Sequence, residues 1–351
     1  MGMRRETGNA ASTHDLAPSL PTSLDVARRA GVSQSTVSLV FGGKATGRVS
    51  QRKQEAVLQA ASELGYRPNQ VARTLRSGRS RLVILAVPDV SNPLFASVLQ
   101  GAEQAARKHH YSVMLASVRD EHDWQEVILD ALQSQAVDGC LLHTMRYVPL
   151  QEDAPLEGKV VLVDASSPAF PSLQLDLRAG VHAAMTHLFS LGHTRIAHLA
   201  AAVDMETFFL RHSAYLAELE TAGLAVSKAY HEYAPFLLDE ASAAAHRLLT
   251  CSDPPSAILC DSDVLAVGVY KAAKSLHRRI PQDLSVVSFD DSIIARMLEP
   301  ELTTVAIPTT TIGEQAFLLL LSLLEGKNMS SPVIIPLELV IRASTAAPCA
   351  T

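Results

Sequence analysis

The chain has 351 residues, of which 48% are hydrophobic and 5% aromatic, a composition typical of folded globular proteins rather than disordered or fibrous ones. Its longest apolar runs fall well short of the roughly 20 residues that a membrane-crossing helix needs, and its polar N-terminal residues do not form a secretory signal. We therefore expect no membrane partner and a cytoplasmic location.

Charge divides sharply along the sequence. Residues 22–81 contain 11 Lys and Arg against 3 acids, a net charge of +8, whereas residues 82–351 carry a net charge of −14. A small basic head on a large acidic body is typical of a protein that holds nucleic acid at one end while the other end repels it.

The N-terminal part begins with a flexible tail, 1–21, which is rich in small and polar residues. Three short helical patterns follow at 24–30, 34–41 and 51–64, with Gly31 between the first two and Ser33 placed to cap the second. This spacing predicts a small all-α helix-turn-helix domain over 22–67. A minimal helical domain with solvated polar residues is the alternative, and the charge of +8 favours DNA.

A linker over 68–80 contains one or two possible helical turns and ends in Ser-Gly-Arg-Ser. From residue 82 onward, short apolar strands alternate with amphipathic helices, a pattern that predicts parallel sheets with helices on both faces. We expect an α/β body of two doubly wound, Rossmann-like lobes. In the first half, strands are predicted at 82–87, 112–117, 138–142, 159–164 and 171–176, and helices at 93–109 and 124–135. In the second, strands are predicted at 195–200, 230–233, 256–260 and 284–289, and helices at 179–191, 207–222, 240–250 and 264–276.

The sequence predicts neither an enzyme nor a catalytic residue, because it contains no Walker, G-x-S-x-G or G-x-G-x-x-G motif. The cysteines Cys140, Cys251, Cys260 and Cys349 lack both C-x-x-C pairing and neighbouring histidines, which favours reduced, buried thiols over disulfides or zinc. Asp261 and Asp263 would suit a metal, but acids at strand ends commonly cap helices. We therefore expect neither a metal nor a cofactor.

A series of motifs in the head and the body carries a family resemblance. In the head these are Leu24-Asp25-Val26-Ala27, Ala30-Gly31-Val32-Ser33, Thr36-Val37-Ser38, Arg48-Val49-Ser50 and Leu64-Gly65-Tyr66-Arg67-Pro68-Asn69. In the body they include Val87-Pro88-Asp89, Val137-Asp138-Gly139, Leu191-Gly192-His193, Phe289-Asp290-Asp291 and Leu302-Thr303-Thr304-Val305. Their order resembles that of the LacI/GalR family of bacterial transcriptional regulators, from residue 22 to about 343.

For the head, the resemblance implies a homodimer that reads the two half-sites of a near-palindromic double-stranded DNA operator. Leu39 departs from the family, since many members carry Arg there, and an apolar side chain could contact only a thymine methyl. In the hinge helix that the linker resembles, Leu75 would enter the minor groove, or alternatively only touch the body. The DNA-binding residues predicted in this way are Ser33, Gln34, Ser35, Thr36, Ser38, Leu39, Asn69, Ala72, Leu75 and Arg76.

For the body, the resemblance implies a type I periplasmic-binding-protein-like domain over 81–345 that dimerises and binds a small effector between its lobes. Lobe 1 would comprise about 81–177 and 308–336, lobe 2 about 178–307 and 337–345, with a tail over 346–351. The predicted effector-binding residues are Arg211, Asp290, Phe95 and Ser262, the last at a frequent Asn position. The alternatives are a surface arginine, a helix-capping aspartate and, for Phe95 as for Phe208 or Phe209, plain core packing.

We therefore predict a sequence-specific transcriptional regulator that responds allosterically to a sugar-like effector. Repression is the mode of action that we expect first. A small-molecule receptor or a nucleoside-responsive regulator is the alternative. The operator sequence, the target genes and the sign of the response to effector stay open.

Overall fold

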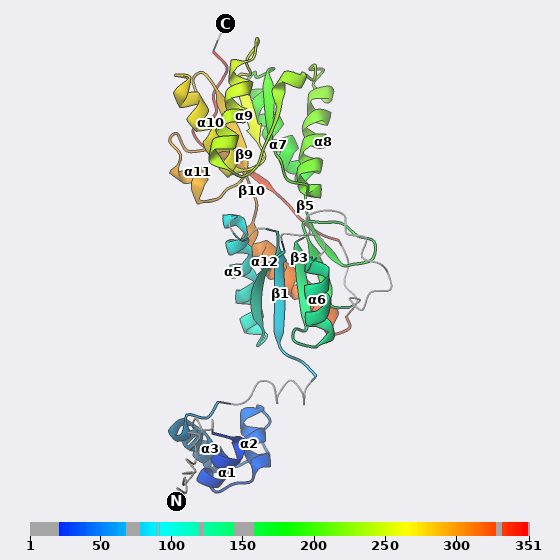
Figure 1. Cartoon of the computed structure of the whole chain (residues 1–351), viewed down its shortest axis with the longest axis vertical. Helices are drawn as coiled ribbons and strands as arrows, with labels where there is room; N and C mark the ends of the chain where they lie inside the picture. Colours follow the sequence, from blue (N-terminus) through cyan, green and yellow to red (C-terminus); the bar gives the residue numbers. More distant parts are fainter. Residues whose placement is uncertain are drawn as a thin grey trace, which may run out of the picture. The chain divides into compact units, whose positions relative to one another are not determined.

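The structure is a computed structural model, and it describes residues 21–67, 78–88, 90, 92–118, 123–143, 158–327 and 332–349. The chain divides into two compact units, Met1–Arg79 and Ser80–Thr351. We call the described residues 21–67 the head and the second unit the body (Figure 1).

The head consists of three helices, α1 (Ser23–Ala30), α2 (Gln34–Phe41) and α3 (Gln51–Leu64). Thr22 and Asp25 form a reciprocal capping box at the start of α1, and Ser33 accepts a hydrogen bond from the Thr36 amide at the start of α2. Gly31 ends α1 with a φ of 64°, a left-handed conformation in which a side chain would be strained. The core residues of the head are Val26, Ala27, Val37, Val57, Ala60 and Ala61.

Lobe 1 of the body is built on a six-stranded sheet in the order β11-β5-β4-β3-β1-β2, in which every strand pair is parallel. Its strands are β1 (Leu82–Val87), β2 (Ser112–Ser117), β3 (Gly139–His143), β4 (Val160–Val163), β5 (Ser172–Leu175) and β11 (Val333–Ile335). Its helices are α5 (Pro93–Lys108), α6 (Asp123–Gln133) and α12 (Thr309–Leu324).

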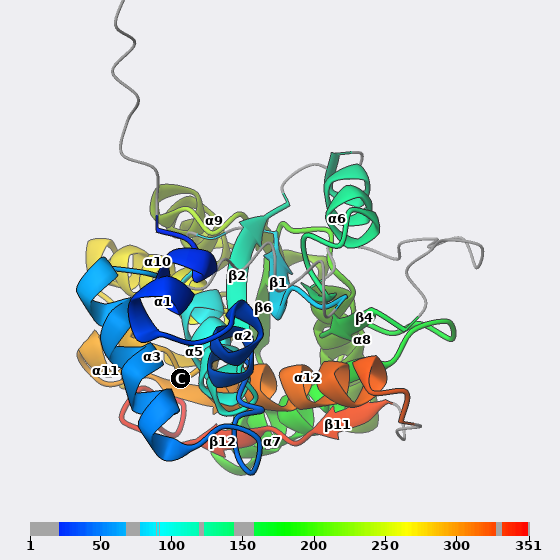
Figure 2. The ribbon, with the colours of Figure 1, turned by 90° about the horizontal axis from the view of Figure 1, so that it is seen from below.

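The strand β1 shows how this sheet is covered on both faces. Val83, Leu85 and Val87 pack into a core with α5 and α12, whereas Ile84 and Ala86 pack with α6 on the opposite face. Figure 2 shows α6 on one side of β1 and β2, and α5 and α12 on the other. Side chains alternate between the faces of a strand, so a continuous apolar run is what a sheet buried on both faces requires.

Lobe 2 repeats this plan in a sheet of the order β12-β10-β9-β8-β6-β7, which is parallel except for the antiparallel β10 and β12. Its strands are β6 (Ile196–Ala201), β7 (His231–Ala234), β8 (Ala257–Cys260), β9 (Ser285–Asp290), β10 (Thr303–Ala306) and β12 (Glu338–Val340). Its helices are α7 (Leu177–Ser190), α8 (Glu206–Thr221), the 3-10 turn η1 (Lys228–Tyr230), α9 (Leu238–Thr250), α10 (Asp263–Ser275) and α11 (Ile293–Met297).

The chain passes between the two lobes three times: from β5 to α7, from β10 to α12, and from β11 to β12. The fold class predicted from the sequence is confirmed, because an all-α head precedes two doubly wound α/β lobes. The elements from α11 to β12 do not stand out in the sequence pattern and are additions from the structure.

The four cysteines are free thiols. Cys140 and Cys260 are buried, as expected, but the expectation is wrong for Cys349, which is exposed, and for Cys251, which is half-buried. In the part of the chain that the structure describes, no helix is both long enough and apolar enough to cross a membrane.

Candidate functional site

The first turn of α2 presents a row of polar side chains. Ser33, Gln34 and Ser35 are exposed, and Thr36 and Ser38 are half-buried. Because side chains at the start of a helix project beyond its end, these groups could reach base edges or phosphates if α2 lay in a DNA groove. Leu39, on the same helix, is half-buried.

Two hydrogen bonds hold this polar row in the isolated chain. The Ser33 hydroxyl lies 2.9 Å from that of Thr36, and the Gln34 side-chain amide donates to the Ser23 hydroxyl at 2.9 Å. The Gln34 amide has a second N–H and an oxygen besides the N–H that Ser23 accepts, so it could contact a base while this bond persists.

The head also carries exposed basic residues: Arg28, Arg29, Lys44, Arg48, Arg52, Lys53 and Arg67. Arg29 forms an ion pair with Glu63 of α3, at 2.7 Å between Nη2 and Oε2. A polar helix start in a domain with many exposed basic residues suits a polyanion, since contacts to phosphates supply most of the affinity of DNA-binding proteins. The predicted hinge residues Asn69, Ala72, Leu75 and Arg76 lie outside the described residues.

The body contains a cavity of about 690 Å³ between its two lobes, with residues of both among its walls. Many of its polar groups stand at or just after the carboxyl ends of parallel strands: His143 on β3, Asp164 after β4, Asp261 after β8 and Asp290 on β9. This is where doubly wound sheets bind ligands, because the loops that follow the strands diverge there. A cavity of this size fits a small metabolite.

Arg211 of α8 is a cavity-lining residue and not a surface arginine, since it is only 3% exposed. Its guanidinium donates through Nη1 to the Asp261 carbonyl and lies over the Phe289 ring, 4.3 Å from its centroid. Its Nε is buried without a hydrogen-bond partner among the described residues. A ligand oxygen in the cavity could satisfy this donor.

Asp290 also faces the cavity, and Ser292, not Asp290, caps the following helix α11. The Ser262 hydroxyl donates to the Asp290 carboxylate at 2.7 Å. Burial, reinforced by the negative charge of Asp263, raises the pKa of Asp290 to about 7. This carboxyl group can therefore either donate or accept a hydrogen bond near neutral pH.

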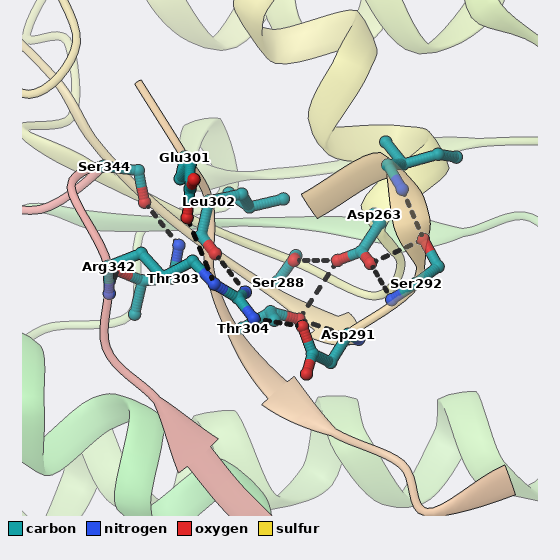
Figure 3. A network of polar contacts seen from close by, with 11 residues as sticks. Asp263, Ser288, Asp291, Ser292, Glu301, Leu302, Thr303, Thr304, Arg342 and Ser344 are labelled. Carbon is teal, nitrogen blue, oxygen red and sulfur yellow. Dashed lines mark hydrogen bonds and ion pairs between the residues drawn. The ribbon is translucent and has the colours of Figure 1, made fainter. Parts of the chain in front are cut away.

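A polar network behind the cavity fixes the backbone next to Asp290 (Figure 3). The buried Asp263 carboxylate accepts hydrogen bonds from the hydroxyls of Ser288 and Thr304 and from both the amide and the hydroxyl of Ser292. Arg342 adds an ion pair to Asp291, at 2.5 Å between Nη2 and Oδ1. Both carboxylate oxygens of Asp263 are thus occupied by protein donors.

The aromatic walls of the cavity include Phe95, which is 4% exposed and packs edge-on against the His143 ring. Of the two neighbouring phenylalanines on α8, Phe208 lines the cavity, whereas Phe209 is 80% exposed. All four effector-binding residues predicted from the sequence, Phe95, Arg211, Ser262 and Asp290, line this one cavity.

The polar cavity residues that are missing from the predicted effector-binding set include His143 and Asp164. Burial raises the pKa of Asp164 to about 6 and lowers the pKa of His143 to about 4. The two side chains lie 3.9 Å apart, between Nε2 and Oδ2. Their sequence signal is position: His143 is the last residue of a buried strand, and Asp164 directly follows one.

Comparison with known protein families gives one match in the N-terminal part of the chain and one in the body. Residues 22–69 match the family described as bacterial regulatory proteins, lacI family. Residues 185–345 match the periplasmic binding protein-like domain.

Individual relatives align along nearly the whole chain. The HTH-type transcriptional repressor CytR of Escherichia coli (strain K12) is 32% identical over 334 residues, which cover 93% of this chain and 96% of the relative. The ribose operon repressor of Halalkalibacterium halodurans is 34% identical over 331 residues, which cover 93% and 97%.

Solved structures extend the similarity to three dimensions. The lac repressor dimer bound to operator and the anti-inducer ONPF matches with a TM-score of 0.83 at 26% identity, over 94% of this chain and 100% of that one. The complex of the transcriptional regulator CelR with cellobiose matches with a TM-score of 0.68 at 30% identity, over 92% and 99%.

Proposed function

This chain belongs to the lacI family of bacterial regulatory proteins, and we propose that it is a repressor that binds an operator as a homodimer and changes its operator affinity when a small molecule enters the body. It acts in the cytoplasm and binds its effector without transforming it. The observation that carries the proposal is the pairing, in one chain, of an exposed polar helix start in a basic head with a ligand-sized cavity in an acidic body.

In the head, we assign base reading to Gln34 and Ser35, which are the exposed residues at the start of α2. Ser33, Thr36 and Ser38 bind phosphates, and Leu39 contacts a thymine methyl. The proposal extends to the residues of the linker on the strength of the family resemblance: Asn69, Ala72 and Arg76 support the DNA contact, and Leu75 enters the minor groove.

In the body, we propose a carbohydrate or a carbohydrate derivative as the effector. Arg211 and Asp290 provide a charged donor and a carboxyl group on one side of the cavity, a combination that suits vicinal hydroxyls. Phe95 provides an apolar wall against which a sugar ring can pack.

A nucleoside is the second candidate, and the composition of the cavity walls favours it. Three phenylalanines, Phe95, Phe208 and Phe236, line the cavity, and Asn92 is the single side-chain amide among the lining residues of the described chain. A ligand with hydroxyls at one end and a flat ring at the other would use both surfaces. Ribose attached to a base has this form.

The DNA-binding half of the proposal is tested by selecting bound sequences from a randomised duplex pool with the full chain. Gln34→Ala should change the preferred bases of the half-site, whereas Lys44→Ala should weaken all sequences alike and reduce the salt dependence of binding. An unchanged base preference in Gln34→Ala would contradict the placement of α2.

The effector half is tested by thermal-shift screening of the full chain against hexoses, pentoses and nucleosides, because a ligand that binds the folded state raises its Tm. The ligand found should lose its effect on both Tm and operator binding in Asp290→Ala. Phe209→Ala is the matched control, since this exposed neighbour of Phe208 does not line the cavity. An equal loss in both variants would contradict the assignment.

A further inference from the structure

Three histidines meet on one face of the sheet of lobe 2, beside the cavity and outside the sites described above. His198 on β6 and His231 on β7 are direct partners in the parallel register, so their side chains leave the sheet on the same face. The helix α8 contributes His212 to the cluster. The ring centroids of His212 and His231 are 4.1 Å apart, and that of His198 lies 5.5 Å and 5.3 Å from them.

The three rings of this cluster bring one nitrogen each close to the other two. One ring nitrogen from each histidine can be chosen so that all three lie within 4.8 Å of one another. The Nδ1 atoms of His198 and His212 are 3.3 Å apart. Two imidazole nitrogens bound to one tetrahedral zinc ion at about 2.0–2.1 Å are separated by about 3.3 Å, so this pair already has the spacing of two ligands.

A carboxylate orients the most deeply buried member of the cluster. The Nε2 atom of His198 lies 3.0 Å from Oδ1 of Asp261, whose Oδ2 accepts a hydrogen bond from the Ala201 amide at 2.9 Å. When Nε2 of His198 carries the proton and donates to Asp261, Nδ1 is left with a lone pair, and this atom lies 3.3 Å from Nδ1 of His212. This carboxylate–histidine arrangement is the one that orients histidine ligands around metal ions.

His231 supplies an independent observation. Both of its ring nitrogens are buried and lack a hydrogen-bond partner in the described part of the chain. A purely structural histidine would be expected to satisfy at least one of them, since buried polar groups are almost always paired. A bound ion between the three rings would satisfy one nitrogen of His231 directly.

The three histidines differ in burial. His198 is fully buried, whereas His212 and His231 are half-buried as whole residues. The neighbouring Tyr215 hydroxyl donates to the Ile196 carbonyl at 2.9 Å. Three imidazole ligands would leave the fourth position of a tetrahedral ion to water.

We propose that His198, His212 and His231 bind one divalent transition-metal ion, with Zn²⁺ as the best-suited ion and water as its fourth ligand. Neutral imidazoles favour Zn²⁺, Cu²⁺, Ni²⁺ and Co²⁺ over Mg²⁺ and Ca²⁺, which prefer oxygen ligands. This proposal departs from the expectation from sequence that the chain holds no metal. It does not depend on the proposed function.

The position of the site links it to the effector cavity. His212 directly follows Arg211 on α8. Asp261 connects the two sites, because its carboxylate contacts His198 and its backbone carbonyl accepts a hydrogen bond from the Arg211 guanidinium. The ion would join α8 to β6 and β7 next to the arginine that faces the cavity. Metal occupancy therefore fixes the helix that carries Arg211.

The test uses the full chain, stripped of metal with a chelator that is then removed. Zn²⁺ titrated in competition with a chromophoric chelator should bind at one equivalent per chain with a Kd below the micromolar range, and Mg²⁺ should not compete. Co²⁺ in its place should give the intense visible absorption of a tetrahedral site. His212→Gln and His231→Gln should each weaken Zn²⁺ binding at least 100-fold while the chain keeps its circular dichroism spectrum.

His182→Gln is the matched control, since this histidine is exposed on α7 and pairs with Glu218 at 3.0 Å. It should bind Zn²⁺ like the parent. The proposal is overturned if the parent binds no Zn²⁺ at micromolar concentration, if both cluster variants bind it as tightly as the parent, or if the Co²⁺ spectrum is that of an octahedral site.

Discussion

The two lobes of the body share a sheet plan but bury different chemistry. Among the described residues, lobe 1 buries two polar side chains, His143 and Ser172, and its core is otherwise a packing of apolar groups. Lobe 2 buries twelve: His193, His198, Thr207, Arg211, Asp261, Ser262, Asp263, Ser285, Ser288, Thr303, Thr304 and Ser344. Both lobes are therefore stabilised by apolar cores, and lobe 2 adds buried polar networks to its own.

This difference bears on what each lobe contributes to ligand binding. Both lobes line the cavity with polar and apolar residues, His143, Asp164 and Phe95 among those of lobe 1, but Arg211 and Asp290, with the hydrogen bonds that hold them, belong to lobe 2. A buried charge costs free energy unless its partners are in place beforehand. Lobe 2 provides these partners within its own sheet and helices, which keeps the charged groups in position while the cavity is empty.

The largest effect is expected for Asp263→Ala. This change leaves the hydroxyls of Ser288, Thr304 and Ser292 and one backbone amide without their acceptor inside lobe 2. We expect a loss of about 3–5 kcal/mol in the free energy of unfolding, as when one partner of a buried charged network is removed. Urea unfolding measures it, and Asp130→Ala, an exposed position on α6, is the control. A loss below about 1 kcal/mol would show that the network contributes little to lobe 2.

The matching test of lobe 1 is Gly313→Ala. A Cβ at this position would lie 1.9 Å from the Val98 carbonyl oxygen, because α12 and α5 approach closely there. A backbone carbonyl cannot turn aside as a side chain can, so we expect a loss of about 1–3 kcal/mol or more from overpacking. Gln315→Ala, an exposed position two residues further along α12, should change stability little. Equal unfolding midpoints for the two variants would mean that the helices can separate at low cost.

A pH-dependent effect is expected at Asp290. Its pKa is raised to about 7 by burial and by the charge of Asp263, so the folded chain holds a proton between about pH 4 and 7 that the unfolded chain releases. The stability that this proton contributes is fully present below about pH 4 and is lost as the pH rises through about 7. The Asp290→Asn side chain cannot ionise, so the Tm of this variant minus the Tm of the parent should increase as the pH rises from 5 to 8. A difference in Tm that does not vary with pH would contradict the raised pKa.

The sequence predicts the elements best where local signals are complete. The helices α2 and α3 begin and end at the predicted residues, because each combines a capping position with apolar residues at helical spacing. The helix α12 escapes prediction because it is apolar on most of its surface and therefore shows no clear amphipathic period. The strands β11 and β12 have three residues each, which is too short for an alternation to be recognised.

The candidate sites divide in a similar way. Arg211 and Asp290 can be found through the family resemblance, but residue type alone does not distinguish Phe208 from its exposed neighbour Phe209. His198, His212 and His231 lie on three different elements, and only the pairing of β6 with β7 and the position of α8 bring them together. Long-range contacts of this kind have no signal in a single sequence.

The smallest effect is expected for an exposed ion pair in lobe 1. Arg107 and Glu103 are one turn apart on α5, 3.1 Å between Nη2 and Oε2, with the arginine side chain 78% exposed. A double-mutant cycle on this pair should give a coupling of about 0.3–0.5 kcal/mol, which salt reduces further, because water screens the charges and both side chains lose freedom on pairing.

The pair of Arg342 and Asp291 in lobe 2 has side chains that are only 11% and 16% exposed. Its coupling should be about 1.5–3 kcal/mol, in the range for hydrogen bonds to charged groups away from water, and should respond little to salt. Equal couplings and equal salt responses in the two cycles would mean that burial does not distinguish the polar contacts of lobe 2 from those on the surface of lobe 1.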